Sequence, residues 1–209
     1  MGEANNTLED RTAYAEARDE TLVIAALLGG LTAFDELVRR YRQAVTFVAR
    51  QVLGGGGIGA AEDIAQDVFL IAFQSLPSLE EPAKFAGWLY AITRHRARRI
   101  AMRERRTLPT EGTDLERLSE ARRPDHEAAA ADPAQYWERQ SQKQEVWDAL
   151  ERLPSEHREV LYLHYCEEWP LARIAAFLSL PETTIKGRLH RSRDAFRRLL
   201  TGTITTTKG

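Results

Sequence analysis

The residues of this chain best suited to binding chemistry are arginines, and they are concentrated in two short segments. Residues 94–106 read RHRARRIAMRERR, with seven arginines against one glutamate, and residues 186–198 are basic again. Arginine and lysine side chains bind phosphate groups, so such clusters favour a nucleic-acid partner. The whole chain has 29 Lys and Arg against 31 Asp and Glu, so its net charge of −2 indicates no partner and only the local charge is informative.

The sharper signal lies at 171–200, where a short apolar segment, a break at 179–181 and a longer basic segment predict a helix-turn-helix. A basic amphipathic helix alone is more often a solvated face, but the preceding short helix and turn favour DNA binding. Ile185, Leu189 and Phe196 share one face of the second helix, which leaves the opposite face for the major groove. The residues expected at this DNA interface are Thr183, Thr184, Lys186, Gly187, Arg188, His190 and Arg191.

The other basic segment follows three aromatic residues, Phe85, Trp88 and Tyr90. Arginines beside aromatic rings suit single-stranded nucleic acid, because the cations follow the phosphates while the bases stack on the rings. Phe85 and Trp88 have the spacing of core residues, so we expect them mainly to fill a helical bundle, whereas Tyr90 lies off that face. The arginines cannot all be buried, because an unpaired buried charge is too costly.

The elements that carry these residues are predicted to be helices. Apolar residues recur at three- and four-residue spacing over 34–52 and 64–72, which indicates two helices of one bundle. The four glycines at 54–57 separate them, since each glycine costs a helix about 1 kcal/mol. Glu62 and Asp63 are then expected in the first turn of the second helix, at the positive end of its dipole.

The remaining helices are predicted from about Lys84, after a proline-bounded loop, and then at 133–153, 155–166, 171–178 and 182–200. Prolines 154, 170 and 181 stand at or before the last three starts, where a missing N–H is tolerated. With no strand pattern in evidence, we predict an all-α fold of two small helical bundles joined by a flexible linker. The predicted boundaries are an acidic tail (1–20), a first domain (21–106), a linker (107–132), a second domain (133–201) and a C-terminal tail (202–209).

Four segments in order resemble bacterial sigma factors of the sigma-70 family, in the small extracytoplasmic-function (ECF) group. They are AEDIAQDVFLIAF (61–73), FAGWLYAITRHRARRI (85–100), ALERLPSEHREVLYLHY (149–165) and TTIKGRLHRSRDAFRRLL (183–200). The resemblance covers about 33–106, as sigma region two, and 144–200, as region four. It implies a non-enzymatic protein that binds core RNA polymerase and directs transcription initiation at minus-ten and minus-thirty-five promoter elements.

The resemblance also implies roles for individual residues. Region four would read duplex minus-thirty-five DNA through the interface given above. Residues 76–84 would form a loop beside a flipped base. Core polymerase docking is expected at Glu62, Asp63, Gln66 and Asp67. The opened minus-ten strand is expected at Lys84, Tyr90, His95, Arg96, Arg98 and Arg99.

The chain departs from the pattern of the family at several positions. The helix-turn-helix opens with PLAR (170–173), where a serine and an acidic pair are usual. His95 stands where members usually have asparagine, which changes the hydrogen-bonding groups offered to the minus-ten bases. Ser179 stands in the turn where glycine is usual, so a slightly different turn geometry is expected. Gly187 stands where serine is frequent, and the absence of a side chain would let the helix approach DNA closely.

Other classes of function are less well supported. The alternative is a polymerase-independent helix-turn-helix regulator, but such a protein has no need of the acidic, glutamine-containing segment AEDIAQDVF on a separate domain. A nucleic-acid-processing enzyme is disfavoured because metal and nucleotide motifs are missing, and we expect no cofactor and no metal. We expect a cytoplasmic protein without membrane insertion, since no apolar run approaches the roughly 18 residues of a membrane span. An anti-sigma protein is a common partner in the family.

Overall fold

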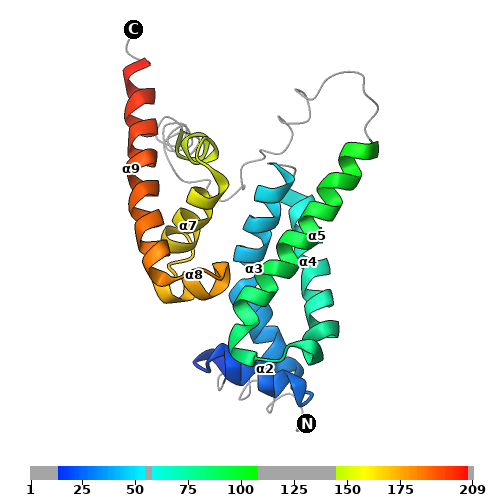
Figure 1. Cartoon of the computed structure of the whole chain (residues 1–209). Helices are drawn as coiled ribbons and strands as arrows, with labels where there is room; N and C mark the ends of the chain where they lie inside the picture. Colours follow the sequence, from blue (N-terminus) through cyan, green and yellow to red (C-terminus); the bar gives the residue numbers. More distant parts are fainter. Residues whose placement is uncertain (1–13, 55–57, 108–144, 207–209) are drawn as a thin grey trace, which may run out of the picture. The chain divides into compact units, whose positions relative to one another are not determined.

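The structure is a computed structural model that describes residues 14–54, 58–107 and 145–206 (Figure 1). Every regular element within these ranges is helical, which confirms the all-α prediction. Contacts divide the chain into two compact units. The first contains α2 to α5, and the second contains residues 145–151, α7, α9 and the part of α8 before Ala176. Each unit is described by itself.

Between residues 19 and 107, the described residues of the first unit form four helices and two short 3-10 turns. They are α2 (Asp19–Leu27), α3 (Leu31–Leu53), α4 (Ile58–Ser75), η1 (Leu76–Ser78), η2 (Pro82–Lys84) and α5 (Phe85–Thr107). Helix α3 packs against α2, α4 and α5, and α4 also packs against α5. The fully buried core takes Leu37 and Val45 from α3, Val68 from α4 and Leu89 from α5, so the predicted apolar faces do meet in one bundle.

Two details of this unit differ from the sequence prediction. Helix α2 is not predicted, because all seven residues of LVIAALL (22–28) are apolar and no single face stands out in the sequence. Helix α4 begins at Ile58, so the placement of Glu62 and Asp63 in its first turn is wrong. They lie one turn further in, where the helix dipole stabilises a carboxylate less. The break after α3 is confirmed at Gly54, which has a φ of 77° and closes the helix in the left-handed conformation.

Arg40 of α3 holds the segment that precedes α2. Its guanidinium uses all five N–H donors: Nε binds Glu36, Nη1 binds Asp19 and the Ala17 carbonyl, and Nη2 binds the carbonyls of Tyr14 and Ala15, at 2.7–2.9 Å. The Tyr41 hydroxyl donates a second hydrogen bond to Asp19. Residues 14–19 are therefore held on α3, although the sequence places them in an acidic tail.

Glu36 is shared between two arginines of different exposure. Arg39 donates two hydrogen bonds to its carboxylate and Arg40 donates one. These bonds, the one from Arg39 foremost, hold the pKa of Glu36 below its usual value. The Arg39 side chain is 66% exposed, whereas that of Arg40 is 13% exposed, so only Arg40 depends on its partners to compensate for lost hydration.

The second unit contains a helical segment at 145–151, the helix α7 (Ser155–Tyr165), the part of α8 (Leu171–Leu178) up to Ala175, and the helix α9 (Glu182–Thr206). The carbonyls of Pro154, Pro170 and Pro181 each accept the first hydrogen bonds of the helix that follows, which confirms the predicted starts. Helix α7 packs against α9. Of the helix predicted at 133–153, the part before 145 lies outside the described residues.

The turn between α8 and α9 keeps the geometry that glycine usually supplies. Ser179 has a φ of 54°, and the Leu180 N–H binds the Ala175 carbonyl at 3.0 Å, as in a Schellman cap. A non-glycine residue in this conformation costs of order 1 kcal/mol. The turn therefore has the geometry that glycine usually provides, and the backbone at Ser179 is strained.

We predict that Arg40→Lys lowers the free energy of unfolding of the first unit by about 2 kcal/mol or more, because an ammonium cannot serve five acceptors in a plane. The matched control is Arg39→Lys, which alters an exposed pair with the same glutamate and should cost less than about 1 kcal/mol. Urea denaturation followed by circular dichroism measures both. Equal losses would show that the Arg40 network does not hold the segment.

Candidate nucleic-acid interface

Helix α9 presents a polar, basic face on the side away from the core of the second unit. Ile185, Leu189 and Ser192 are buried, as the predicted helix face requires. The Ser192 hydroxyl is satisfied by donating to the Arg188 carbonyl at 2.7 Å. The side chains exposed on the other face are Thr183, Lys186, His190, Arg191, Arg193, Arg197 and Arg198. The second helix of the predicted helix-turn-helix thus exposes a cationic surface over several turns.

Two of the expected contact residues are partly engaged within the protein. Arg188 lies half-buried with Nη2 3.0 Å from the Glu156 carboxylate of α7, and this pair joins the two helices. His190 Nδ1 lies 3.2 Å from Asp194 on the next turn. Thr184 and Gly187 are partly covered. Of the predicted set, Lys186 and Arg191 are the cations that stand most openly on the surface.

Helix α5 carries the second basic surface, and its buried face differs from the predicted one. Phe85, Leu89 and Thr93 are buried, whereas Trp88 is only half-buried. Phe85 is thus a core residue, as predicted, whereas the side chain of Trp88 is more accessible to solvent than predicted. Thr93 is tolerated inside because its hydroxyl donates to the Leu89 carbonyl at 2.8 Å.

The predicted minus-ten residues lie on the open side of α5 and on the loop before it. His95, Arg98 and Arg99 are exposed. The Tyr90 hydroxyl accepts a hydrogen bond from Arg94 at 2.8 Å, and the guanidinium of Arg94 lies 5.6 Å from the ring centroid. Lys84, in η2, pairs with the exposed Glu81 at 2.6 Å, a pair that an incoming phosphate could replace at little cost.

One ion pair connects the two predicted interfaces of the first unit. Asp67 of α4, expected to dock polymerase, binds Arg96 of α5, expected to line the minus-ten strand, with Nη2 to Oδ2 at 2.5 Å. Glu62, Asp63 and Gln66 on the same helix are exposed. The structure thus leaves three of the four docking residues open and uses the fourth to orient an arginine.

A groove of about 330 Å³ lies between α4 and α5 beside this pair. Trp88 and Ile92 form its apolar side on α5, Ile71 faces them from α4, and His95 and Arg99 border it. Ile71 belongs to the apolar pattern at 64–72 that predicts a buried helix face, but its side chain is exposed in this groove. Apolar spacing identifies the face of a helix that packs on its neighbours, but it does not tell whether a residue at the edge of that face is covered.

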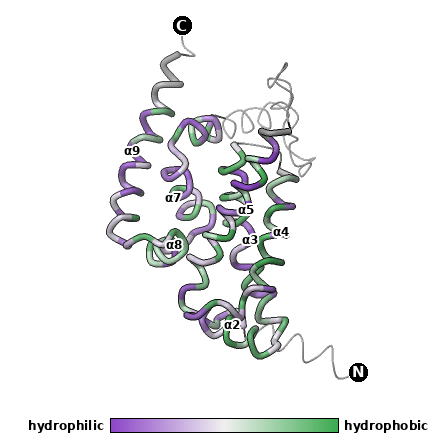
Figure 2. The backbone as a smooth tube through the Cα atoms, turned by 45° about the vertical axis from the view of Figure 1, so that its right-hand side comes forward, coloured by the Kyte–Doolittle hydropathy of each residue, from purple (hydrophilic) through white to green (hydrophobic). Residues whose placement is uncertain are grey.

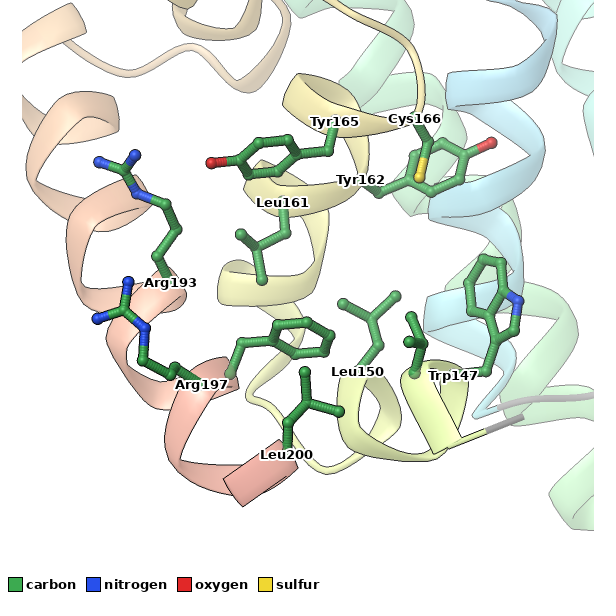
Figure 3. Close-up of a pocket in the computed structure, with 11 residues that line it drawn as sticks. Trp147, Leu150, Leu161, Tyr162, Tyr165, Cys166, Arg193, Arg197 and Leu200 are labelled. Carbon is green, nitrogen blue, oxygen red and sulfur yellow. The ribbon is translucent and has the colours of Figure 1, made fainter. Parts of the chain in front are cut away.

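A second, larger groove lies in the second unit and is not predicted from the sequence. It measures about 450 Å³ and is walled by apolar side chains of residues 145–151, α7 and α9, including Trp147, Leu161 and Leu200 (Figure 3). Arg193 and Arg197 border it on α9. Burial, with a smaller effect from Glu167, raises the pKa of Cys166 in its wall, so this thiol stays protonated at neutral pH.

The described part of the chain contains no group of three or more potential metal ligands among its His, Cys, Asp and Glu residues. Within the same residues, no helix combines the length and hydropathy that crossing a membrane requires. The candidate functional surfaces of the described residues are the basic faces of α5 and α9, the exposed face of α4 and the two grooves.

Comparison with known protein families assigns both units. Residues 37–107 match the family model for sigma-70 region 2, and residues 143–196 match the model for sigma-70, region 4. The chain belongs to the sigma-70 family, in its ECF group. The helix-turn-helix in the second unit is consistent with region 4.

Individual relatives agree with this assignment. The chain is 33% identical over 172 residues to the probable RNA polymerase sigma factor RfaY of Xanthomonas campestris pv. campestris, covering 82% of this chain but only 41% of that protein. It is 29% identical over 176 residues to the ECF RNA polymerase sigma factor SigW of Bacillus subtilis, covering 82% of this chain and 91% of that protein. The fold is similar to sigma factor RpoE of Bartonella quintana, solved in complex with the anti-sigma factor NepR, with a TM-score of 0.50, 22% identity and coverage of 80% and 95% of the two chains.

Gly187 provides a test of the α9 surface that separates stability from binding. A Cβ added there would meet only the Arg191 Nη1 atom, at 3.6 Å, so alanine fits. We predict that Gly187→Ala raises the free energy of unfolding by about 0.5–1 kcal/mol, since alanine favours the helix. If α9 enters the major groove as predicted, the added methyl group would lie against the DNA, and the same change should weaken duplex binding. Urea denaturation and fluorescence anisotropy on promoter DNA measure the two effects.

The control for this prediction is Gly59→Ala in α4, where an added Cβ meets no neighbour within 4 Å. It should stabilise the first unit by a similar amount and leave duplex binding by α9 unchanged. If Gly187→Ala binds duplex DNA as well as the unmodified chain does, this part of α9 does not approach DNA closely.

Proposed function

We propose that this protein binds core RNA polymerase and directs it to promoters, as an ECF sigma factor with region two at 21–106, a linker at 107–132 and region four at 133–201. The observation that carries the proposal is the presence of two separate cationic helix faces, on α5 and α9, in units that match region 2 and region 4. The first face lies on the same unit as the exposed acidic and amide side chains of α4.

The α9 face is proposed to read the duplex minus-thirty-five element. Exposed side chains near the N-terminal end of a helix in the major groove can reach base edges, and arginines further along hold phosphates. Lys186 and Arg191 would supply the principal contacts, with Thr183, Thr184 and His190 beside them. Arg188 would act mainly by fixing α9 on α7 through Glu156.

The α5 face is proposed to hold the opened minus-ten strand. Extracting one base from a duplex costs a few kcal/mol of stacking and pairing, which protein contacts must offset. Exposed His95, Arg98 and Arg99 provide hydrogen-bonding and cationic groups along one side of α5. Tyr90 and Lys84 lie nearer its start, next to the loop at 76–84 that we assign to a flipped base.

The protein itself catalyses no reaction in this proposal, and the binding energy of both interfaces is used to open and position promoter DNA on the polymerase. We place it in the cytoplasm, where promoter DNA lies. An anti-sigma partner is proposed by analogy with RpoE, and the apolar groove of the second unit is a suitable surface for a protein partner. A polymerase-independent regulator would leave the exposed α4 face without a role.

We predict that the purified chain, added to core RNA polymerase, produces start-site-specific transcripts from a genomic promoter library. Run-off transcription followed by sequencing of the transcript ends measures this and yields the promoter motif. Arg191→Ala should reduce transcription from promoters with a minus-thirty-five element, at a cost of about 1–3 kcal/mol in binding. Duplex binding by the isolated chain without any polymerase-dependent transcripts would favour the regulator instead.

Replacing Asp63 and Gln66 together by alanine should weaken association with core polymerase, because both side chains are exposed on α4 and neither supports the core. Duplex binding by the second unit should stay unchanged. Fluorescence anisotropy of a labelled chain titrated with core polymerase measures the first effect, and a gel-shift assay measures the second. Loss of both activities would indicate misfolding, which circular dichroism would detect.

A further inference from the structure

One histidine on the basic face of α9 is held by a carboxylate of the same helix. The Nδ1 atom of His190 lies 3.2 Å from the Oδ2 atom of Asp194, one helical turn further along. This separation is within the range of a hydrogen bond from an N–H donor to an oxygen. Because an ionised carboxylate only accepts hydrogen bonds, the proton of this contact is carried by Nδ1.

The contact directs the other ring nitrogen of His190, Nε2, away from the helix. The two nitrogens lie on different edges of the imidazole ring, so holding Nδ1 fixes where Nε2 points. The side chain of His190 is 70% exposed, whereas that of Asp194 is 46% exposed. A ring that is held at one edge loses less freedom when it binds a partner, so Asp194 orients His190 in advance.

His190 lies in the part of α9 that is predicted to enter the major groove. It follows Lys186 by one helical turn and adjoins Arg191, and both of these cations are exposed. Figure 2 shows hydrophilic segments of α9 between hydrophobic ones, as expected of a helix that buries one face. Lysine and arginine only donate hydrogen bonds. Of these three side chains, only the imidazole can also accept one from a base.

The hydrogen-bonding role of Nε2 depends on whether the ring carries a second proton. With Nδ1 protonated, the neutral ring presents Nε2 as an acceptor, whereas the imidazolium presents Nε2–H as a donor. In the major groove, cytosine and adenine offer amino donors, whereas guanine and thymine offer acceptors only. The neutral ring therefore suits cytosine or adenine. Adenine also has an acceptor, N7, so cytosine separates the two forms of the ring most clearly.

The charges around the pair come from α9 and from the helices beside it. Arg197 Nη1 lies 3.8 Å from the other oxygen of Asp194. In α7, which packs against α9, Glu156 is bound by Arg188, and in α8 Arg173 lies over the Trp169 ring. The charged residues of α9 between 186 and 197, apart from Asp194, are all basic: Lys186, Arg188, Arg191, Arg193 and Arg197. Histidine side chains in general gain their second proton between about pH 5 and 8, so a change of role can be followed in that range.

We propose that His190 reads one base pair of duplex DNA, and that Asp194 is a positioning residue that fixes the ring so that Nε2 selects cytosine or adenine. Acidification converts Nε2 into a donor and moves the preference at that base pair to guanine or thymine. The inference rests on the proposed function and deepens it, because it names a specificity-determining residue of the α9 face and makes the recognised sequence depend on pH.

The test selects duplexes from a library randomised over the minus-thirty-five element, with the full-length chain bound to core polymerase, at about pH 8 and about pH 5.5. At one position, the unmodified chain is expected to prefer cytosine or adenine by about fivefold or more at the higher pH. At the lower pH this preference should disappear or reverse. His190→Ala should remove selectivity at this position alone, at both pH values.

Asp194→Ala separates orientation from simple charge. It should weaken the preference at the same position, because the ring is no longer held, while overall affinity for the duplex stays equal or rises, because an acidic group next to the DNA is lost. Uniformly weaker binding to all sequences would show that the pair only supports the helix, and the inference would be wrong.

The matched control is His164→Gln. The Nδ1 atom of His164 also lies 3.2 Å from an oxygen, the Trp169 carbonyl, but this histidine belongs to α7 and not to the face of α9 that is predicted to meet DNA. The variant should select the same sequence with the same response to pH. Circular dichroism checks that every variant is folded.

The remaining outcomes separate this inference from the proposed function. If the unmodified chain selects a minus-thirty-five sequence that neither changes with pH nor depends on His190, the inference is overturned and the proposed function stands. Selectivity that His190→Ala removes, but that neither pH nor Asp194→Ala alters, shows a contact without orientation and also contradicts the inference. If the chain and polymerase select no sequence at all, both fail.

Discussion

The cost of removing arginine from water organises both units of this protein. A guanidinium keeps its charge at any physiological pH, so each arginine either stays exposed or is compensated by partners. Arg40, the least exposed of those described above, uses every donor on acceptors of its own unit. Arg96 and Arg188 are partly covered, and each has one carboxylate partner. The arginines that stay exposed to water form the two basic faces. The arginines that hold helices together differ from them in being covered and paired with carboxylates.

The paired arginines also connect surfaces that the sequence treats as independent. Because Asp67 binds Arg96, α4, which is proposed to dock polymerase, orients a side chain of α5, which is proposed to hold the minus-ten strand. Because Glu156 binds Arg188, the position of α9 depends on α7. A change at either carboxylate would thus alter an arginine on another helix, so the docking surface of α4 and the basic face of α5 are parts of one packed bundle.

Two departures from the family pattern have different physical consequences. Ser179 adopts the left-handed conformation that glycine provides more cheaply, so the turn of the helix-turn-helix is preserved at a cost in backbone strain. Gly187 lies inside α9, where its backbone freedom weakens the helix, yet a larger side chain would fit. Packing therefore does not explain the glycine, whereas the proposed close approach to DNA would.

The sequence by itself determined the all-α class, the two bundles, most helix bounds and the outward face of α9. These properties follow from local periodicity, proline positions and the cost of burying charge, and each is visible within one segment. Glu62 and Asp63 lie a turn later than predicted because nothing in the glycine-rich segment marks where α4 begins. The exposure of Trp88 and Ile71 could not be predicted, because it depends on how far neighbouring helices cover the edge of an apolar face.

Only the tertiary structure decided which side chains from distant segments meet. The Arg40 network joins residues more than twenty positions apart, and the Phe34–Phe73 ring contact joins α3 to α4. Such pairs have no periodic signature, since they arise from the packing of one helix on another and not from the propensity of either.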